Sequence, residues 1–385
     1  MSEQPSEAPP ILEYLMAMGN HQASDLYLTA GRPPTLRAED KMITLGENIL
    51  SVQDIEGILS TMLTSRQKRE FDSNMELNTA LDMGETGRFR VNVLKQRQLP
   101  ALVIRRIISK IPSFEDLKLP PILASLSMEK RGLVLITGIT GSGKSTTLAS
   151  MVDHRNENAE GHIITIEDPI EYYHEHKRAV VTQREVGVDT QSYGIAMKNA
   201  LRQRPDVILV GEIRDREVMD QALTITETGH LCLATIHTNN AYQAIERIVN
   251  FFPEELAGQV RLNLAMNLKA IISQRLIPGV NNELVPAVEI MLNQGLVREL
   301  ILKGEITKIK DVMEQNNNLG MCTFDQSLLG LFQRGLIAEE TAMTNSDRPS
   351  DLKIKLQQIK LSAQDDGEEG DTLGQIDTSR IKFGD

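Results

Sequence analysis

Tryptophan is absent from this chain of 385 residues, and aromatic residues make up only 4% of it. Proteins that bind single-stranded nucleic acid commonly stack the bases on aromatic rings, and this sequence offers no evident platform of that kind. Positive charge is also scarce, because 41 Lys and Arg residues stand against 53 Asp and Glu residues, a formal net charge of −12. Such a chain has little electrostatic affinity for nucleic acid or anionic lipid, so we expect no nucleic-acid partner.

Cysteines and long apolar runs are also rare. The two cysteines, Cys232 and Cys322, lie 90 positions apart without a CxxC motif, which excludes a disulfide framework and a four-thiolate zinc site. No window approaches the run of about 18 apolar residues that a membrane-spanning helix needs. The first residues are acidic, where a signal peptide would be basic. We therefore expect a cytoplasmic protein with no direct membrane insertion.

The strongest motif lies in residues 132–148, where an apolar run leads into a glycine-rich turn and then a helical pattern. Glycines let backbone N–H groups converge on phosphate oxygens at a helix N-terminus, where the helix dipole is positive. Lys144 adds a point charge, and the Ser145 hydroxyl suits Mg²⁺. Chance would produce this pattern in on the order of one in a hundred chains of this length. The motif predicts nucleotide binding by Thr140, Gly141, Ser142, Gly143, Lys144, Ser145 and Thr146.

The length is too great for one ordinary hydrophobic core and predicts two domains. Near the start, a helix is expected at 52–63 with Ser51 as its N-cap. Farther on, apolar strand-like runs alternate with helical patterns such as 215–228 and 256–275. This alternation predicts an α/β fold with a parallel sheet covered on both faces. The strand-like runs are 162–167, 206–211, 231–236 and 287–292.

Composition changes along the chain suggest its boundaries. We expect a disordered start (1–10), an α/β amino-terminal domain (11–112), a linker (113–122), a P-loop domain with carboxy-terminal helices (123–345), an extra helix (346–362) and an acidic disordered tail (363–385). The tail is either a solvated, solubilising segment or a docking peptide.

Carboxylates follow two of the expected strands. Glu212 ends the run 206–211 and is expected to point toward the phosphates, where it can hold the Mg²⁺ shell or orient water. Many P-loop enzymes place an Asp just before such a Glu, but here that position is Gly211. Segment 165–171 offers further carboxylates, including Glu167 and Glu171; alternatively it is a surface turn. The predicted metal ligands are Ser145, Glu167 and Glu212.

Two histidines, His230 and His237, bracket the strand-like run 231–236. Strict alternation along a strand puts them on opposite faces of the sheet, so they make a poor metal pair. Each is either a satisfied polar residue at a strand end or a neutral donor that senses the γ-phosphate.

Three arginines, Arg88, Arg90 and Arg105, cluster on the expected strands of the first domain. They are either solvated strand residues or, in a ring, groups that reach a neighbour's site and stabilise the charge of phosphoryl transfer.

Five ordered motifs together resemble the secretion-type ATPases, and within them the type IV pilus retraction ATPases PilT and PilU. The motifs are GITGSGKSTT, TIEDPIEY, TQREVGVDT, LRQRPDVILVGEIRD and TGHLCLATIHT. The resemblance implies a RecA-like P-loop NTPase domain preceded by a PAS-like domain. It also implies a homohexamer that hydrolyses ATP with Mg²⁺ to remove pilins through an inner-membrane platform protein at the pilus base.

The resemblance also assigns roles to the candidate residues. Glu212 becomes the Walker B acid, Glu171 the general base, and His230 and His237 the coupling histidines, while the arginines of the first domain reach a neighbouring site. The absence of a four-cysteine module favours retraction over extension. The departure from the PilT pattern at 296–301 and the added tail favour the accessory PilU type, which works alongside a PilT-type ATPase.

Two other functions fit the same sequence. The chain is alternatively an interaction subunit whose nucleotide cycle mainly sets ring shape and docking. A DNA-translocating relative is disfavoured by the acidic composition. The intact set of Lys144, Glu171 and Glu212 favours the motor enzyme.

Overall fold

The computed structural model describes residues 11–38, 41–107, 110–281 and 283–365. The expected disordered start (1–10) lies outside these ranges, as does the expected tail apart from its first residues, which end a helix. The chain divides into two compact units. The amino-terminal unit contains residues 1–110 with 170–173 and 187–189, and the carboxy-terminal unit contains the rest. Across the described ranges, no helix has both the length and the apolar character of a membrane span.

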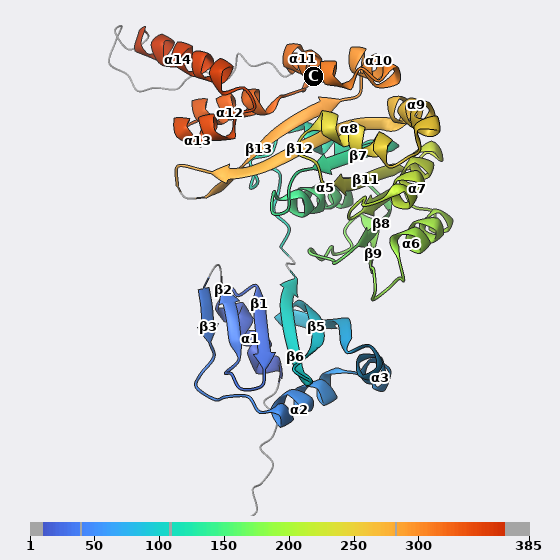
Figure 1. Ribbon diagram of the computed structural model, residues 1–385, viewed down its shortest axis with the longest axis vertical. Helices are drawn as coiled ribbons and strands as arrows, with labels where there is room; N and C mark the ends of the chain where they lie inside the picture. Colours follow the sequence, from blue (N-terminus) through green and yellow to red (C-terminus); the bar gives the residue numbers. More distant parts are fainter. Residues whose placement is uncertain (1–10, 39–40, 108–109, 282, 366–385) are drawn as a thin grey trace, which may run out of the picture. The chain divides into compact units, whose positions relative to one another are not determined.

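The amino-terminal unit is built on an antiparallel six-stranded sheet with the order β3-β2-β1-β6-β5-β4 (Figure 1). Its strands are β1 (Asp25–Thr29), β2 (Thr35–Ala38), β3 (Lys41–Thr44), β4 (Glu76–Asp82), β5 (Arg88–Gln96) and β6 (Leu99–Ile107). Its helices are α1 (Ile11–Asn20), α2 (Val52–Met62) and α3 (Ser65–Asn74). A capping box between Ser51 and Asp54 starts α2, which confirms the predicted N-cap.

Alternation along β5 separates its core face from its polar face. Phe89, Val91 and Val93 are buried in the core of the unit. Because successive side chains of a strand point to opposite faces, Arg88 and Arg90 lie on the face away from this core.

The carboxy-terminal unit is built on a seven-stranded sheet with the order β13-β12-β7-β11-β10-β8-β9 (Figure 1). All its neighbouring strands are parallel except β12 and β13, which form an antiparallel pair at one edge. The strands are β7 (Gly132–Thr137), β8 (Gly161–Glu167), β9 (Ala179–Glu185), β10 (Val207–Val210), β11 (Leu231–Ile236), β12 (Leu268–Pro278) and β13 (Leu284–Leu292). Every residue of β7, β10 and β11 is buried, as expected for central parallel strands.

Eleven α-helices complete the described part of this unit. They are α4 (Ile122–Ser127), α5 (Lys144–Asn158), α6 (Tyr193–Ala200), α7 (Arg216–Glu227), α8 (Ala241–Asn250), α9 (Ala257–Asn267), α10 (Leu296–Lys303), α11 (Ile309–Gln315), α12 (Phe324–Gln333), α13 (Glu339–Asn345) and α14 (Pro349–Asp365). The mixed α/β fold is therefore confirmed.

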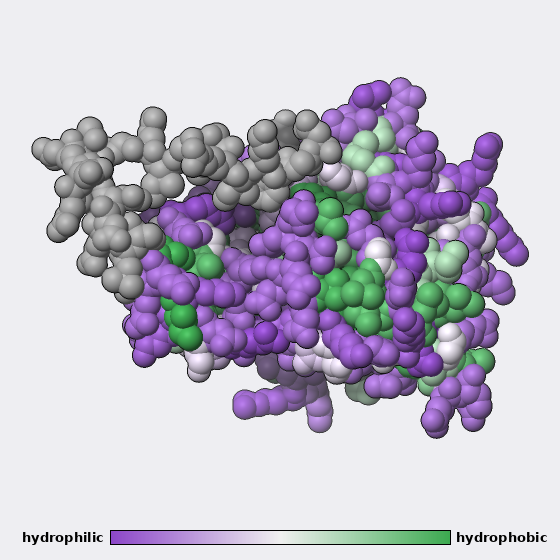
Figure 2. Space-filling model, turned by 90° about the horizontal axis from the view of Figure 1, so that it is seen from above, coloured by the Kyte–Doolittle hydropathy of each residue, from purple (hydrophilic) through white to green (hydrophobic). Residues whose placement is uncertain are grey.

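Seen from above, the surface is mostly hydrophilic with separate groups of apolar residues (Figure 2).

One predicted helix is wrong in its second half. The pattern at 256–275 predicts a single helix, but α9 ends at Asn267 and β12 begins at Leu268. Most of β12 is buried on both faces, including the polar Ser273 and Gln274, so its sequence lacks the apolar–polar alternation that would distinguish it from a helix.

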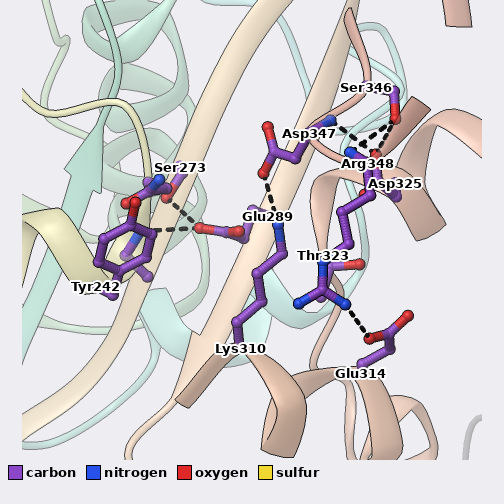
Figure 3. Close-up of polar contacts among 12 residues, drawn as sticks. Tyr242, Ser273, Glu289, Lys310, Glu314, Thr323, Asp325, Ser346, Asp347 and Arg348 are labelled. Carbon is purple, nitrogen blue, oxygen red and sulfur yellow. Dashed lines mark hydrogen bonds and ion pairs between the residues drawn. The ribbon is translucent and has the colours of Figure 1, made fainter. Parts of the chain in front are cut away.

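The last three helices pack on β12 and β13 around a separate apolar core. This core contains Ile277, Val285, Phe324, Leu328, Leu352 and Leu356. Next to it, the Arg275 guanidinium stacks on the Phe324 ring at 3.8 Å from the ring centroid. The same guanidinium donates to the Asp347 carboxylate at 2.9 Å, and Lys310 Nζ contacts the other Asp347 oxygen at 2.9 Å (Figure 3). Asp347 thus joins the helices to the edge of the sheet.

We predict that Asp347→Asn destabilises the protein by about 1–3 kcal/mol at pH 7, because it leaves two half-buried cations with a weaker partner. Burial opposes ionisation, but bonds from Lys310 and Arg275 outweigh it and lower the pKa of Asp347. A lowered pKa gives stability that is present above about pH 4 and is lost as the pH falls below it. Urea unfolding of wild type and variant should therefore differ at pH 7 and converge as the pH falls through the lowered pKa of Asp347.

Asp311→Asn is the matched control, since the Asp311 side chain is 65% exposed and its ion pair with Arg348 spans 3.5 Å. Exposed pairs of this kind contribute about 0–1 kcal/mol. Equal destabilisation by the two substitutions, or a pH-independent effect at Asp347, would contradict the prediction.

Candidate active site

The phosphate loop connects β7 to α5 through residues 138–143. Gly143, the residue before α5, has φ of 85°, in the left-handed region that favours glycine. The predicted phosphate-binding residues, 140–146, occupy the end of this loop and the first turn of α5. The start of a helix offers free backbone N–H groups and the positive end of the helix dipole, which together suit an anion.

Two polar side chains in the loop fit a phosphate group. Lys144 is only 8% exposed, and its Nζ donates to the carbonyls of Gly138 at 2.9 Å and Ile139 at 2.8 Å. The hydroxyl of Ser142 is buried and has no hydrogen-bond partner in the protein. An unsatisfied buried hydroxyl costs free energy, and a phosphate oxygen would satisfy it. The loop therefore fits the phosphates of a nucleotide.

The predicted Walker B glutamate lies at the same edge of the sheet. Glu212 follows β10, and β11 lies between β10 and the loop-bearing β7. Strands are about 4.8 Å apart, so the ends of β7 and β10 are about 10 Å apart. All three strands are parallel, and ligands of such sheets bind beyond the carboxyl ends of the strands.

Glu212 is held between two donors. One carboxylate oxygen lies 3.0 Å from His237 Nε2, and the other accepts from Arg214 Nε at 2.8 Å. Arg214 also lies 3.4 Å from the Asp168 carboxylate. The bond from Glu212 raises the pKa of Arg214 against partial burial, with further electrostatic support from Asp168. This Glu212 cluster, formed by Glu212, His237, Arg214 and Asp168, fixes the direction of the Glu212 carboxylate.

Glu167 lies beside this cluster at the end of β8. Ile166 pairs with Val210 of β10, which places Glu167 next to Gly211. Its Oε1 accepts from Thr165 Oγ1 at 2.6 Å and from Gln183 Nε2 at 3.3 Å. In the described part of the chain, no three His, Cys, Asp or Glu side chains gather as a metal site. Mg²⁺ is usually held by one or two protein ligands together with substrate phosphates, which the chemistry of Ser145, Glu167 and Glu212 fits.

Packing explains why glycine occupies the position before Glu212. A Cβ on Gly211 would lie 2.9 Å from the Tyr193 hydroxyl, 3.2 Å from Glu167 Cα and 3.3 Å from the Ile166 carbonyl. No side chain fits there without movement of its neighbours. The Asp found at this position in many P-loop enzymes would therefore require the Tyr193 side chain and β8 to move.

His230 does not join the Glu212 cluster. It precedes β11, whereas His237 follows it, and the six residues of β11 separate the two by about 20 Å. The His230 ring contacts Thr228 Oγ1 at 3.1 Å and the Ile225 carbonyl at 3.3 Å. His230 thus lies at the opposite edge of the sheet from the phosphate loop of its own chain.

Glu171 and the three arginines lie in the amino-terminal unit. Arg105 donates to the buried Asp25 at 2.8 Å, and this bond raises its pKa against partial burial, with smaller contributions from Asp25 and Glu171 charges. Arg90 is the direct cross-strand neighbour of Arg105. Arg88 lies 3.4 Å from Asp82 and stacks over the Tyr173 ring at 4.8 Å. The arginines and Glu171 therefore form one charged surface of this unit.

Two contributors were missed by the sequence analysis. Arg214 stands in the motif LRQRPDVILVGEIRD, and an arginine two residues after Glu212 was a signal that could have been read. Arg247 of α8 donates to the His237 carbonyl at 3.1 Å, which no local pattern indicates. Arg247 also lines a cleft of about 760 Å³ beside Ile139 and Thr140 of the phosphate loop, a volume typical of small-molecule sites.

This chain is similar to known proteins of secretion and pilus systems. The profile described as type II/IV secretion system protein matches residues 67–307. The type IV pilus ATPase PilU of Pseudomonas aeruginosa is 46% identical over 362 residues, with 94% of each chain covered. The PilT retraction ATPase of the same organism is 39% identical, covering 89% of this chain and 99% of PilT. A crystal structure of the pilus retraction motor PilT with bound ADP is 40% identical, with a TM-score of 0.83 over 89% of this chain and 99% of that one.

We predict that Gly211→Ala destabilises the protein by about 1–3 kcal/mol, because the added methyl group must displace packed neighbours. Urea unfolding of the purified variant measures the effect. Gly258→Ala is the control, since a Cβ there has open space and alanine favours the helix α9. If Gly211→Ala leaves the free energy of unfolding unchanged, the prediction is wrong, because β8 and α6 then move apart without cost.

Proposed function

Because this chain belongs to the type II/IV secretion system protein family, we propose that it is a mechanochemical ATPase that assists type IV pilus retraction. The observation that carries the proposal is the phosphate loop with Lys144 at the same sheet edge as the Glu212 cluster. Its similarity to PilU and PilT makes it a pilus-type, nucleotide-binding secretion ATPase. ATP hydrolysis driving pilin removal is the specific activity we assign to it.

The proposed chemistry uses few groups. Lys144, the Ser142 hydroxyl and the N–H groups of the loop bind the phosphates of ATP and stabilise the charge that develops on the transferred group. Ser145, Glu167 and Glu212 would hold Mg²⁺, which would supply positive charge beside the phosphates. His237 and Arg214 orient the Glu212 carboxylate, which would help to hold Mg²⁺ and orient the attacking water.

Other groups enter the proposal from the amino-terminal unit. We assign to Glu171 the role of general base, and to Arg88, Arg90 and Arg105 contacts with a nucleotide in a ring. These four residues form one charged surface of the amino-terminal unit, which supports the assignment. His230, at the far edge of its own sheet, is assigned a coupling role that requires a neighbouring subunit.

The proposed assembly is a homohexameric ring of RecA-like ATPase domains, each preceded by a PAS-like domain. It acts in the cytoplasm at the pilus base, peripheral to the inner membrane. There it docks on a platform protein and works beside a PilT-type retraction ATPase. The higher identity to PilU than to PilT supports this accessory role.

The second candidate is an interaction subunit that docks on a partner ATPase and whose own turnover is secondary. The family contains pilus and secretion proteins alike, so membership does not separate the two. The intact pair of Lys144 and Glu212, each held in place by hydrogen bonds, favours the enzyme.

We predict that Glu212→Gln lowers the rate of ATP hydrolysis at least about 100-fold, because the amide loses the charge that holds metal and water. ADP binding should persist. Lys144→Ala should lose nucleotide binding, since it removes the buried cation of the loop. Phosphate release and titration with a fluorescent ADP analogue measure the two effects.

Glu227→Gln is the matched control, an exposed residue at the end of α7 with the same change of charge. It should leave both quantities unchanged. Pilus retraction decides between the two candidates when it is scored in cells whose PilT-type partner cannot hydrolyse ATP. Retraction with the wild-type chain but not with Glu212→Gln supports the motor, whereas no retraction with either rejects the motor and supports the interaction subunit.

A further inference from the structure

A single residue of β12, Gln274, lies behind the phosphate loop and contacts the loop at two points and α5 at a third. Its carbonyl oxygen would be 2.4 Å from a Cβ on Gly138, the residue that opens the loop. Its side-chain Nε2 would be 2.7 Å from a Cβ on Gly143, the residue that closes it. Both ends of the loop therefore pack their bare Cα atoms against the same residue.

The third contact is a buried hydrogen bond. Thr147, in the first turns of α5, donates from its hydroxyl to Gln274 Oε1 at 2.7 Å. Gln274 is 3% exposed and Thr147 is fully buried. A buried bond of this kind is costly to break, because water cannot replace the lost partner.

The position of Gln274 in the sheet explains these contacts. The parallel pairing of β12 with β7 ends at Ser273. This residue lies opposite Thr137, the last residue of β7. Gln274 is therefore the first β12 residue beyond the ladder, where β7 leaves the sheet and becomes the loop. The loop turns over this residue and enters α5 beside it.

We propose that Gln274 is a positioning residue of the phosphate loop, which sets nucleotide affinity without touching the nucleotide. Its contacts with Gly138, Gly143 and Thr147 fix the curvature of the loop. That curvature decides whether the loop N–H groups and the helix start converge on one phosphate. The inference rests on the proposed nucleotide-binding function and adds a supporting residue from a distant strand.

The test uses Gln274→Met, which keeps the side-chain volume and removes the hydrogen-bonding groups. We expect the Kd for ADP and the KM for ATP to rise about tenfold, the effect of one lost buried bond. Thr147→Val removes the same bond from the other side and should produce the same change. The double variant should bind ADP no more weakly than either single variant. Thr147→Ser, which keeps the hydroxyl, should bind ADP as the wild type does.

Ser273→Ala is the control on the same strand. Ser273 bonds Glu289 rather than the loop, so its loss should lower the unfolding temperature and leave the Kd for ADP unchanged. The inference is overturned if Gln274→Met and Thr147→Val lower the unfolding temperature but bind ADP as wild type does. If wild-type protein itself binds no ADP, the proposed function fails instead, so the two failures are distinct.

Discussion

The parallel hydrogen-bond ladder of β7, β11, β10 and β8 is the constraint on which the site depends. Strands that run in the same direction must end at the same edge, so each residue that follows a strand is placed beside the others. The phosphate loop follows β7, His237 follows β11, Glu212 nearly follows β10, and Glu167 ends β8. Residues up to about 100 positions apart thus meet because of backbone pairing, before any side-chain contact is considered.

Close packing at this edge limits the chemistry that the sequence can use. β8 and α6 approach β10 so closely that Gly211 has no room for a side chain. The position before Glu212 therefore carries no carboxylate, and the neighbouring residue of the adjacent strand is Glu167. The Glu212 carboxylate is held by His237 and Arg214. Its direction is therefore fixed although position 211 carries no second carboxylate.

Much of this arrangement could be predicted from local patterns. The phosphate loop, α7 and β11 have strong local signals: a glycine pattern, an amphipathic repeat and a buried apolar run. The contact of Arg214 with Glu212 could also have been predicted, because both residues lie in the same short motif. β12 was mistaken for helix because a strand buried on both faces has no alternation. The role of Gln274 could not be predicted, since its partner Thr147 is 127 positions away along the chain and no sequence pattern marks a buried glutamine.

β12 links the site to the rest of its unit through three consecutive residues. Ser273 donates to Glu289, which also accepts from the Ala241 N–H at the start of α8, and burial raises the pKa of this carboxyl against both bonds (Figure 3). Gln274 supports the phosphate loop. Arg275 donates to the Asn345 carbonyl and to Asp347 in the carboxy-terminal helices.

These contacts alternate in direction along the strand, as the pleat requires. β12 pairs with β13 from Ala270 to Pro278 and with β7 as far as Ser273. β12 therefore contacts the phosphate loop through Gln274, and through Ser273 it contacts Glu289, which bonds the start of α8. α8 in turn carries Arg247, which holds the backbone of His237. The two parts of the site are thus both joined to β12, the loop through Gln274 and the Glu212 cluster through Ser273, Glu289 and α8.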